Sequence, residues 1–264
     1  MALSYRSVGR GPTQVLAAHT WLADHQTYAP MLPFIDQDAF TYVFPDFRGY
    51  GRSRDIKGEF SVREMGRDLL AVADELGWSE FFLVGNSMGG QAAQWLAGQS
   101  EAVRRIRGVV LLCAVPARGF PLDPQTAAFF NAAVDSLEVR GECATAVTGG
   151  RLGRGFAAYM SRLSAETATS EAIREYLRAW TEENVASEIH PYDGAVSVLV
   201  GEHDPVLTEA VAREHIAPLF ANAAVATIAG TGHYPAMEVP AYTAALLAQF
   251  MEASTSGALA GRGV

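Results

Sequence analysis

The sequence predicts an α/β fold with a mostly parallel central sheet, and two observations support this prediction. Short β-rich runs alternate with longer segments whose apolar residues recur at helical spacing, which is the pattern of βαβ units. The strand candidates are nearly continuous in Val, Leu and Ile, as expected for strands buried on both faces. With 264 residues, 49% of them apolar, the chain can form one large domain of this class.

Strands and core helices are expected in alternating order along the chain. The strands are residues 13–19, 40–46, 80–85, 106–115, 194–201 and 223–230. The core helices are residues 61–77, 88–100, 208–219 and 238–252. Helix 61–77 is amphipathic and has a glycine at its end. Strand 106–115 is an apolar run, so its Cys113 is interpreted as a small buried hydrophobic residue.

One long segment interrupts the alternation, because no convincing strand lies between Val115 and Ala195. Helical patterns occupy residues 123–141, 152–163 and 170–186. Asp123 is a good N-cap for the first of them, and Pro124 suits its first turn. We interpret the segment as a lid over the edge of the sheet, with a helical layer of the core as the alternative. The expected organisation is a core of residues 1–115 and 195–252, a helical cap of residues 116–194 and a disordered tail of residues 253–264.

Composition excludes several classes of protein. The formal net charge is −9, which disfavours nucleic acid as the main partner, since phosphate binding needs clustered Lys and Arg. No long apolar stretch suggests a membrane span or a secretory signal, and two cysteines suggest neither a disulfide framework nor a metal cluster. We therefore expect a soluble cytoplasmic protein that acts without a metal or an organic cofactor on a small molecule; its oligomeric state is left open.

The stretch Gly85-Asn86-Ser87-Met88-Gly89 matches the pattern G-x-S-x-G between a buried strand and a helix. A sharp strand-to-helix turn holds its serine in an unfavourable backbone region, and the flanking glycines remove the Cβ atoms that would clash there. Ser87 is therefore a candidate nucleophile. The backbone N–H of Met88 opens the helix, so it is a free donor that can stabilise an oxyanion. The alternative is a glycine-rich turn without a catalytic role, and the sequence assigns no task to Asn86.

A serine nucleophile needs a base, and the base needs an orienting acid. For a serine on such a turn the chain order is Ser, acid, His. His233 follows the last strand in a glycine-rich loop and is the expected base. Asp204 follows the preceding strand and is the expected acid, with Glu202 as its rival. His203 is expected to point away from the site, and His215 to lie on the surface.

At this point the chain resembles the α/β-hydrolase-fold superfamily of serine hydrolases over roughly residues 3–252. The resemblance rests on HTWLADHQTYAPML (19–32), FPDFRGYGRSR (44–54), VGNSMGGQAA (84–93), VGEHDPV (200–206) and GTGHYPAMEVP (230–240). It implies a triad of Ser87, Asp204 and His233, and a second oxyanion donor from the loop after the first long strand. The family usually has His-Gly-x there, so the donor falls on the N–H of Trp21, with Thr20 as the alternative.

The same resemblance assigns supporting roles near the site. His19 would brace the oxyanion loop, Asp46 and Arg48 would fix the loop beside the active site, and His25 could face the pocket. Apolar residues of the inserted segment could line a substrate pocket. The candidate substrate contacts are Thr20, His25, Phe129, Phe130, Tyr159 and Trp180.

The expected activity is hydrolysis of an ester, lactone or related acyl bond of a small, fairly hydrophobic substrate. Other chemistry of this fold remains open: C–C bond hydrolysis, haloperoxidase-like perhydrolysis, lyase activity and cofactor-free dioxygenation. A ligand receptor with slow turnover is the alternative from a different class. Aspartate-nucleophile enzymes of the fold are disfavoured, because Ser87 occupies the nucleophile position.

Overall fold

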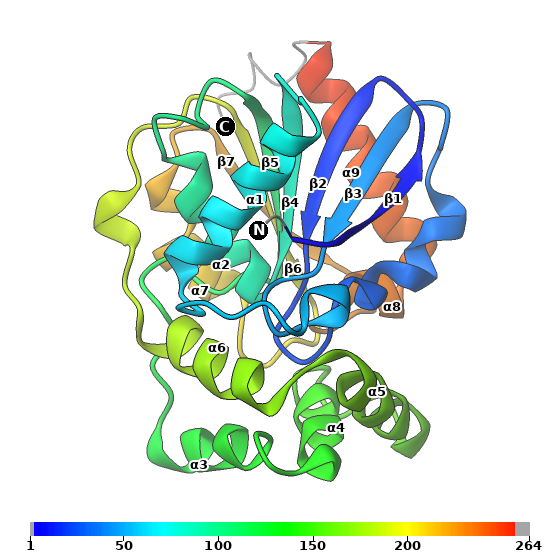
Figure 1. The fold of residues 1–264 in the computed structure, drawn as a ribbon, viewed down its shortest axis with the longest axis vertical. Helices are drawn as coiled ribbons and strands as arrows, with labels where there is room; N and C mark the ends of the chain where they lie inside the picture. The colour runs from blue at the N-terminus through cyan, green and yellow to red at the C-terminus, as the bar shows by residue number, and fades with distance from the viewer. Residues whose placement is uncertain (1–2, 257–264) are drawn as a thin grey trace.

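The computed structural model describes residues 3–256, which form a seven-stranded sheet with helices on both faces (Figure 1). The strand order is β1-β3-β2-β4-β5-β6-β7. The strands are β1 (Tyr5–Gly9), β2 (Thr13–Ala18), β3 (Phe40–Pro45), β4 (Phe81–Asn86), β5 (Ile106–Leu112), β6 (Ala195–Gly201) and β7 (Ala223–Ile228). All neighbouring pairs are parallel except β1 and β3. The mostly parallel α/β sheet is thus confirmed, with β1 as an additional edge strand.

Two hydrophobic clusters fill the space on either face of the sheet. One cluster contains residues of α1 (Val62–Glu75), α2 (Met88–Ala97) and α7 (Glu209–His215) and continues into the inserted segment. The other cluster packs α9 (Pro240–Thr255) and the 3₁₀ helix η1 (His25–Phe34) against the opposite face. Strands β4 and β5 contribute to both clusters, so the chain segments that follow them are held from two sides.

Proline residues divide two of the expected helices. The segment expected as helix 208–219 is α7 followed by the short 3₁₀ helix η4 (Ala217–Leu219), since Pro218 has no N–H for the helical ladder. The segment expected as helix 238–252 consists of the end of α8 (Pro235–Glu238) and α9. Val239 separates these helices at φ −136° and ψ 61°, because the ring of Pro240 disfavours a helical conformation in the preceding residue.

Besides the short 3₁₀ helix η3 (Ala186–Glu188), the inserted segment contains four α-helices between β5 and β6 and, as expected, no strand within these described residues. They are α3 (Pro124–Ala132), α4 (Leu137–Ala146), α5 (Arg154–Thr167) and α6 (Ser170–Glu182), gathered at one end of the sheet (Figure 1). The expectation of one helix over 123–141 was wrong. Ser136 caps a new helix by accepting the N–H of Val139, and the buried Arg140 binds the carbonyls of Ala133 and Val134 at the break.

The prediction of a disordered tail from residue 253 places its start too early. Helix α9 continues to Thr255, where the hydroxyls of Ser254 and Thr255 bind the carbonyls of Phe250 and Met251. Small polar residues can therefore extend this helix by bonding back to its carbonyls. The rest of the expected tail, residues 257–264, lies outside the described residues.

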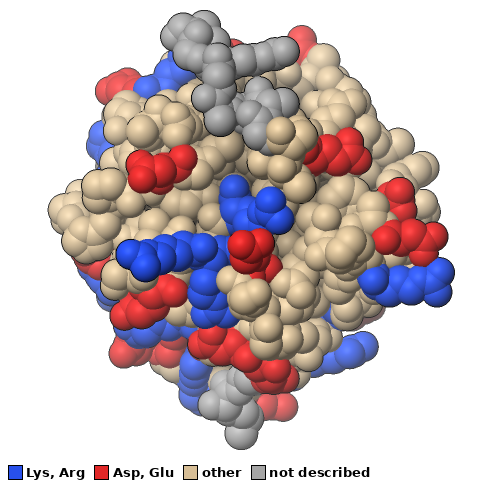
Figure 2. All heavy atoms as spheres, turned by 90° about the horizontal axis from the view of Figure 1, so that it is seen from above, with Lys and Arg blue, Asp and Glu red and all other residues tan. Residues whose placement is uncertain are grey.

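The surface opposite the inserted segment carries acidic and basic side chains side by side (Figure 2). In the part of the chain that the structure describes, no helix is both long and apolar enough to cross a membrane.

Candidate active site

Ser87 lies on a strained turn between β4 and α2. Its backbone has φ 55° and ψ −117°, a left-handed conformation that is rare outside glycine. Hydrogen bonds to neighbouring residues stabilise this strained conformation: the N–H of Ser87 donates to Leu112 O at 3.0 Å, and the N–H of Val115 donates to Ser87 O at 3.0 Å. The end of β5 therefore fixes the turn, and the serine side chain is presented at the end of the sheet where β4 stops.

Glycines around the turn are required by close backbone contacts. A Cβ atom on Gly85 would lie 2.6 Å from the carbonyl oxygen of Gly89, and one on Gly89 would lie 2.5 Å from that of His19. A Cβ atom on Gly90 would meet Ala114 Cβ at 2.4 Å. The first turn of α2 thus packs directly against the backbone of the loop after β2, which is the expected oxyanion loop.

Replacing Gly89 with alanine is expected to lower the free energy of unfolding by about 1–3 kcal/mol, because a rigid backbone must move to admit the methyl group. Gly155→Ala is the matched control, since Gly155 also lies in the first turn of a helix but has no atom within 4 Å of its added Cβ. Its stability should stay unchanged or rise by up to about 1 kcal/mol. Urea denaturation measures both, and a fully stable Gly89→Ala variant would contradict the contact.

Asp204 and His233 meet at the ends of β6 and β7. His233 Nδ1 lies 2.7 Å from Asp204 Oδ2, and both side chains are buried. The other carboxylate oxygen, Oδ1, accepts the N–H groups of Val206 and Leu207 at 2.9 and 3.0 Å. The carboxylate is therefore held in a single orientation, and its bond to Nδ1 leaves His233 Nε2 as the nitrogen available for proton transfer.

The rival acid lies elsewhere. Glu202 accepts the N–H of Gly230 at 2.8 Å through a half-exposed carboxylate, and it lies 3.6 Å from the exposed ring of His203. His215 contacts Arg118 at the surface. The structure thus brings Asp204 to His233, and leaves Glu202, His203 and His215 outside the site.

Asn86, the residue without an expected role, connects the turn to the loop that carries His233. Its side-chain amide donates to Leu112 O at 2.8 Å and to His233 O at 3.4 Å. One buried amide therefore joins the strand before Ser87, the end of β5 and the candidate base. The signal for this role was weak, because Asn is also common in turns for local reasons.

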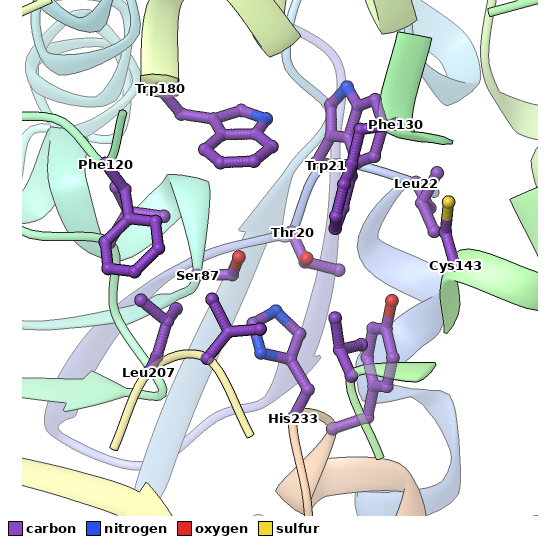
Figure 3. A pocket seen from close by; sticks show the side chains of 14 residues that line it. Thr20, Trp21, Leu22, Ser87, Phe120, Phe130, Cys143, Trp180, Leu207 and His233 are labelled. Atoms are coloured by element: carbon purple, nitrogen blue, oxygen red, sulfur yellow. The ribbon is translucent and has the colours of Figure 1, made fainter. Parts of the chain in front are cut away.

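Ser87 and His233 share a mostly apolar cavity of about 40 Å³ (Figure 3). Its lining residues are Thr20, Trp21, Leu22, Ser87, Val115, Phe120, Phe130, Cys143, Val147, Trp180, Val206, Leu207, His233 and Tyr234. No direct hydrogen bond joins the described side chains of Ser87 and His233. Such bonds are often long before substrate binds and shorten in the reacting complex.

The expected substrate contacts divide into two groups. Thr20, Phe130 and Trp180 line the cavity, as does the side chain of Trp21. His25, Phe129 and Tyr159 do not. The His25 ring turns to Asp46, with Nδ1 2.6 Å from Oδ1, Phe129 packs edge-on against Phe130, and Tyr159 is an exposed residue of α5. These three residues therefore lie outside the cavity that Ser87 and His233 share, unlike what was expected.

Several lining residues escaped sequence reasoning. Val206, Leu207 and Tyr234 directly follow Asp204 or His233, so proximity along the chain was a usable signal for them. Cys143 and Val147 come from the end of α4, and only the packing of the inserted segment brings them to the cavity. Cys113 is buried as expected, and burial raises the pKa of its thiol.

The loop after β2 is pinned at successive carbonyls. Thr20 O accepts a hydrogen bond from His19 Nδ1 at 2.7 Å, and Trp21 O accepts one from the hydroxyl of Tyr50. His19 Nε2 in turn accepts the N–H of Phe47 at 3.0 Å. Because a peptide unit is planar, fixing Thr20 O also fixes the direction of the Trp21 N–H.

Threonine replaces glycine in this loop without backbone strain. Among the described residues the non-glycine positions with positive φ are Phe60, Ser87 and Cys113, and Thr20 is not one of them. The backbone at Thr20 therefore does not need the positive φ angle that favours glycine. The Thr20 side chain forms part of the cavity wall.

Burial lowers the pKa of His19 below its ordinary value, because the charged ring is poorly solvated there. Its two hydrogen bonds suit a neutral ring with the proton on Nδ1. Asp46 has the opposite balance: burial raises its pKa, but the hydrogen bond and the charge of His25, with smaller contributions from His19 and the N–H of Arg52, together outweigh burial and hold the pKa below its usual range. Both groups connect this loop to the start of the loop after β3.

We expect the free energy of unfolding to fall on acidification below about pH 6.5, since unfolded His19 binds a proton that folded His19 does not. One such proton gives a slope of up to about 1.4 kcal/mol per pH unit between the ordinary and the lowered pKa. Urea denaturation of the wild type and His19→Gln between pH 5 and 8 measures it. The variant should lose this part of the slope, and identical slopes would contradict a neutral buried ring.

Two groups of described side chains bring possible metal ligands within 4.8 Å of one another, Cys113 with Asp204 and His233, and Asp24 with His25 and Asp46. In each group the histidine Nδ1 is bonded to a carboxylate, at 2.7 and 2.6 Å. Hydrogen bonding therefore accounts for the short His–carboxylate distance in each group.

The sheet, the serine turn and the Asp–His pair define a class of protein, and comparison with known proteins agrees. The family model described as the α/β hydrolase fold matches residues 14–240. The chain belongs to this family. The enol-lactonase from Burkholderia xenovorans LB400 superimposes with a TM-score of 0.78 at 22% identity, covering 95% of this chain and 96% of that one.

Curated relatives match over shorter segments. A 1H-3-hydroxy-4-oxoquinoline 2,4-dioxygenase of Pseudomonas putida is 32% identical over 69 residues, which is 26% of each chain. The 3-oxoadipate enol-lactonase 2 of Acinetobacter baylyi is 29% identical over 97 residues, 37% of this chain and 36% of the relative. The aligned segments thus span about a quarter and about a third of these two relatives.

Proposed function

We propose that the protein is a serine hydrolase that cleaves an ester, lactone or related acyl bond through an acyl-enzyme on Ser87. One observation carries this proposal. Ser87, on a strained turn, shares a small apolar cavity with His233, whose Nδ1 is bonded to the oriented carboxylate of Asp204. This arrangement supplies a nucleophile, a base and an orienting acid from three separate elements.

In the proposed reaction Ser87 Oγ attacks the carbonyl carbon while His233 Nε2 takes the hydroxyl proton. Asp204 keeps the remaining imidazole proton on Nδ1 and stabilises the charged ring. When the tetrahedral intermediate collapses, His233 donates its proton to the leaving oxygen and the acyl group stays on Ser87. Water then attacks the acyl-enzyme with His233 again acting as base, which releases the acid and restores the serine.

The oxyanion of the intermediate is assigned to two backbone donors. The N–H of Met88 opens α2, where the helix dipole favours negative charge. The N–H of Trp21 lies in the loop pinned by His19 and Tyr50. Donors held in advance stabilise developing charge without reorganisation, and one such donor is typically worth about 10²–10³ in rate.

The inserted helical segment is proposed to act as a cap on this site. Phe130, Cys143, Val147 and Trp180 line the cavity from this segment, and Thr20, Ser87 and His233 line it from the core. An engineered apolar cavity of about 150 Å³ holds benzene, so a cavity of about 40 Å³ suits a small acyl group better than a long one. The apolar wall and small volume favour a short acyl chain.

Hydrolysis of p-nitrophenyl acetate, butyrate and octanoate tests the substrate class. We expect kcat/KM to be highest for acetate or butyrate and at least about 10-fold lower for octanoate, since each methylene that does not fit loses part of its transfer free energy. A parallel arm with γ-butyrolactone and a phenyl lactone separates lactone from ester preference. Fastest turnover of octanoate would contradict the pocket, and absence of turnover on every substrate would contradict the hydrolase.

A second candidate is a cofactor-free dioxygenase. It is favoured by the matched segment of the Pseudomonas putida dioxygenase and by the aromatic rings of Trp21, Phe130 and Trp180, which suit a flat heteroaromatic ring. In that reaction His233 would remove a substrate proton and Ser87 would only help to bind. Conversion of 3-hydroxy-4-quinolone under oxygen that survives Ser87→Ala would favour this candidate over the hydrolase.

A further inference from the structure

We propose that Arg151 and Glu238 form a positioning pair that couples the seating of the cap to the placement of His233. The pair joins the α4–α5 loop, residues 147–153, to the His233 loop, residues 229–234. The role of His233 as the base, which this pair would support, rests on the proposed hydrolase function. The coupling itself rests only on contacts of described residues.

Glu238 holds the backbone on both sides of His233. Its Oε2 accepts the N–H of Gly232 at 2.8 Å, and its Oε1 accepts the N–H of Tyr234 at 3.0 Å. The carboxylate thus fixes the Thr231–Gly232 peptide unit before His233 and the His233–Tyr234 unit directly after it, and so restricts the direction in which the His233 side chain leaves the backbone. No other described side chain binds both of these N–H groups.

The side chain of Glu238 is buried, with 2% of it exposed, so its charge needs a partner. Arg151 supplies it. Nη1 of Arg151 lies 2.9 Å from Glu238 Oε2, and Nη2 donates to Gly230 O at 2.8 Å, so one guanidinium binds the start of the His233 loop directly and its other end through Glu238. The guanidinium presents its N–H donors in a rigid planar fork and can bind two acceptors at once, whereas the lysine ammonium is a compact point charge.

The α4–α5 loop that carries Arg151 is packed tightly on both catalytic loops. A Cβ atom on Gly232 would lie 2.6 Å from Thr148 Cα, and one on Gly149 would lie 2.7 Å from His203 O, next to Asp204. The same loop begins at Val147, which lines the cavity. Any shift of the cap that enlarges the small cavity at Val147 therefore pulls on the Arg151 contact.

This geometry gives the pair a function beyond stability. With the cap seated, Arg151 neutralises Glu238 and Glu238 holds His233 in place. With the cap displaced, the buried carboxylate loses its partner and the His233 loop loses its contact at Gly230. The base would therefore be aligned only when the cavity is closed, which links substrate enclosure to proton transfer.

The test compares Arg151→Met and Arg151→Lys with Arg105→Met. Arg105 is a matched control, because it also binds one carboxylate, that of Asp74, and one backbone carbonyl, Trp78 O. The two arginine side chains are similarly exposed, but the partners of Arg105 lie in α1 and the turn after it, away from the His233 loop. Hydrogen–deuterium exchange at the amides of Gly232 and Tyr234 reads the loop without any substrate. Steady-state hydrolysis of p-nitrophenyl acetate reads the placement of the base.

For Arg151→Met we expect exchange about 10-fold faster at both amides, and kcat about 10-fold lower with KM within about twofold, because the misplaced base affects chemistry more than binding. Arg151→Lys should recover part of both the slow exchange and the kcat, and Arg105→Met should match the wild type.

Unchanged exchange, an unchanged kcat, or an equal loss in Arg105→Met would overturn the coupling. If Arg151→Met does not fold, Arg151→Lys carries the same comparison. Absence of wild-type turnover would instead count against the hydrolase function, and the exchange measurement would still decide the coupling.

Discussion

Ser87→Ala is expected to lower kcat/KM for p-nitrophenyl acetate by at least about 10⁴-fold, because no acyl-enzyme can form without the hydroxyl. The residual rate would come from the oxyanion donors and binding alone. The fold should persist, since alanine keeps the turn and its backbone bonds to Leu112 O and Val115 N–H. Steady-state kinetics on purified variants of equal thermal stability measure the effect.

Ser161→Ala is a suitable control for this substitution. The Ser161 hydroxyl donates to Leu137 O at 2.7 Å within the inserted segment and does not line the cavity. Its removal should change kcat/KM by less than about twofold, as for most surface substitutions. Retention of esterase activity in Ser87→Ala would contradict the proposed nucleophile.

Asp204→Asn is expected to lower kcat by about 10³–10⁴-fold, since an asparagine amide no longer holds the imidazole proton on Nδ1. The wrong tautomer leaves His233 unable to take the serine proton. Asparagine Oδ1 can still accept the N–H groups of Val206 and Leu207, so the turn after β6 should survive. Stopped-flow or steady-state rates on an activated ester provide the measurement.

Glu202→Gln is the matched control, because it neutralises a carboxylate two residues away on the same loop. Its partner is the N–H of Gly230, which glutamine can also satisfy. We expect its kcat to stay within about threefold of the wild type. If Glu202→Gln were as inactive as Asp204→Asn, the acid would have been assigned to the wrong residue.

The core of the fold was predictable because its signals are local. Ser87, Asp204 and His233 each follow an apolar run that forms a parallel strand, and parallel strands end on the same edge of a sheet. Strand order along the chain therefore brought distant residues together without knowledge of side-chain packing. Edge strand β1 was missed, because a five-residue, partly exposed strand has little apolar pattern.

The cavity wall was predictable only in part. Phe130 and Trp180 face the cavity and Phe129 and Tyr159 do not, although all are aromatic residues of the inserted segment. Their orientations depend on the break between α3 and α4 and on the docking of α5 and α6, which are tertiary effects. A bond from His25 to Asp46, 21 positions apart, likewise could not be read from local pattern.

Covalent labelling with a fluorophosphonate probe, followed by intact-mass measurement and peptide mapping, tests the proposed acyl-enzyme chemistry most directly. The probe reacts with an activated serine and does not require knowledge of the substrate. We predict a single adduct on Ser87 in the wild type, strongly slowed in Asp204→Asn and absent in Ser87→Ala. No adduct in the wild type, or an adduct that persists in Ser87→Ala, would contradict Ser87 as the nucleophile.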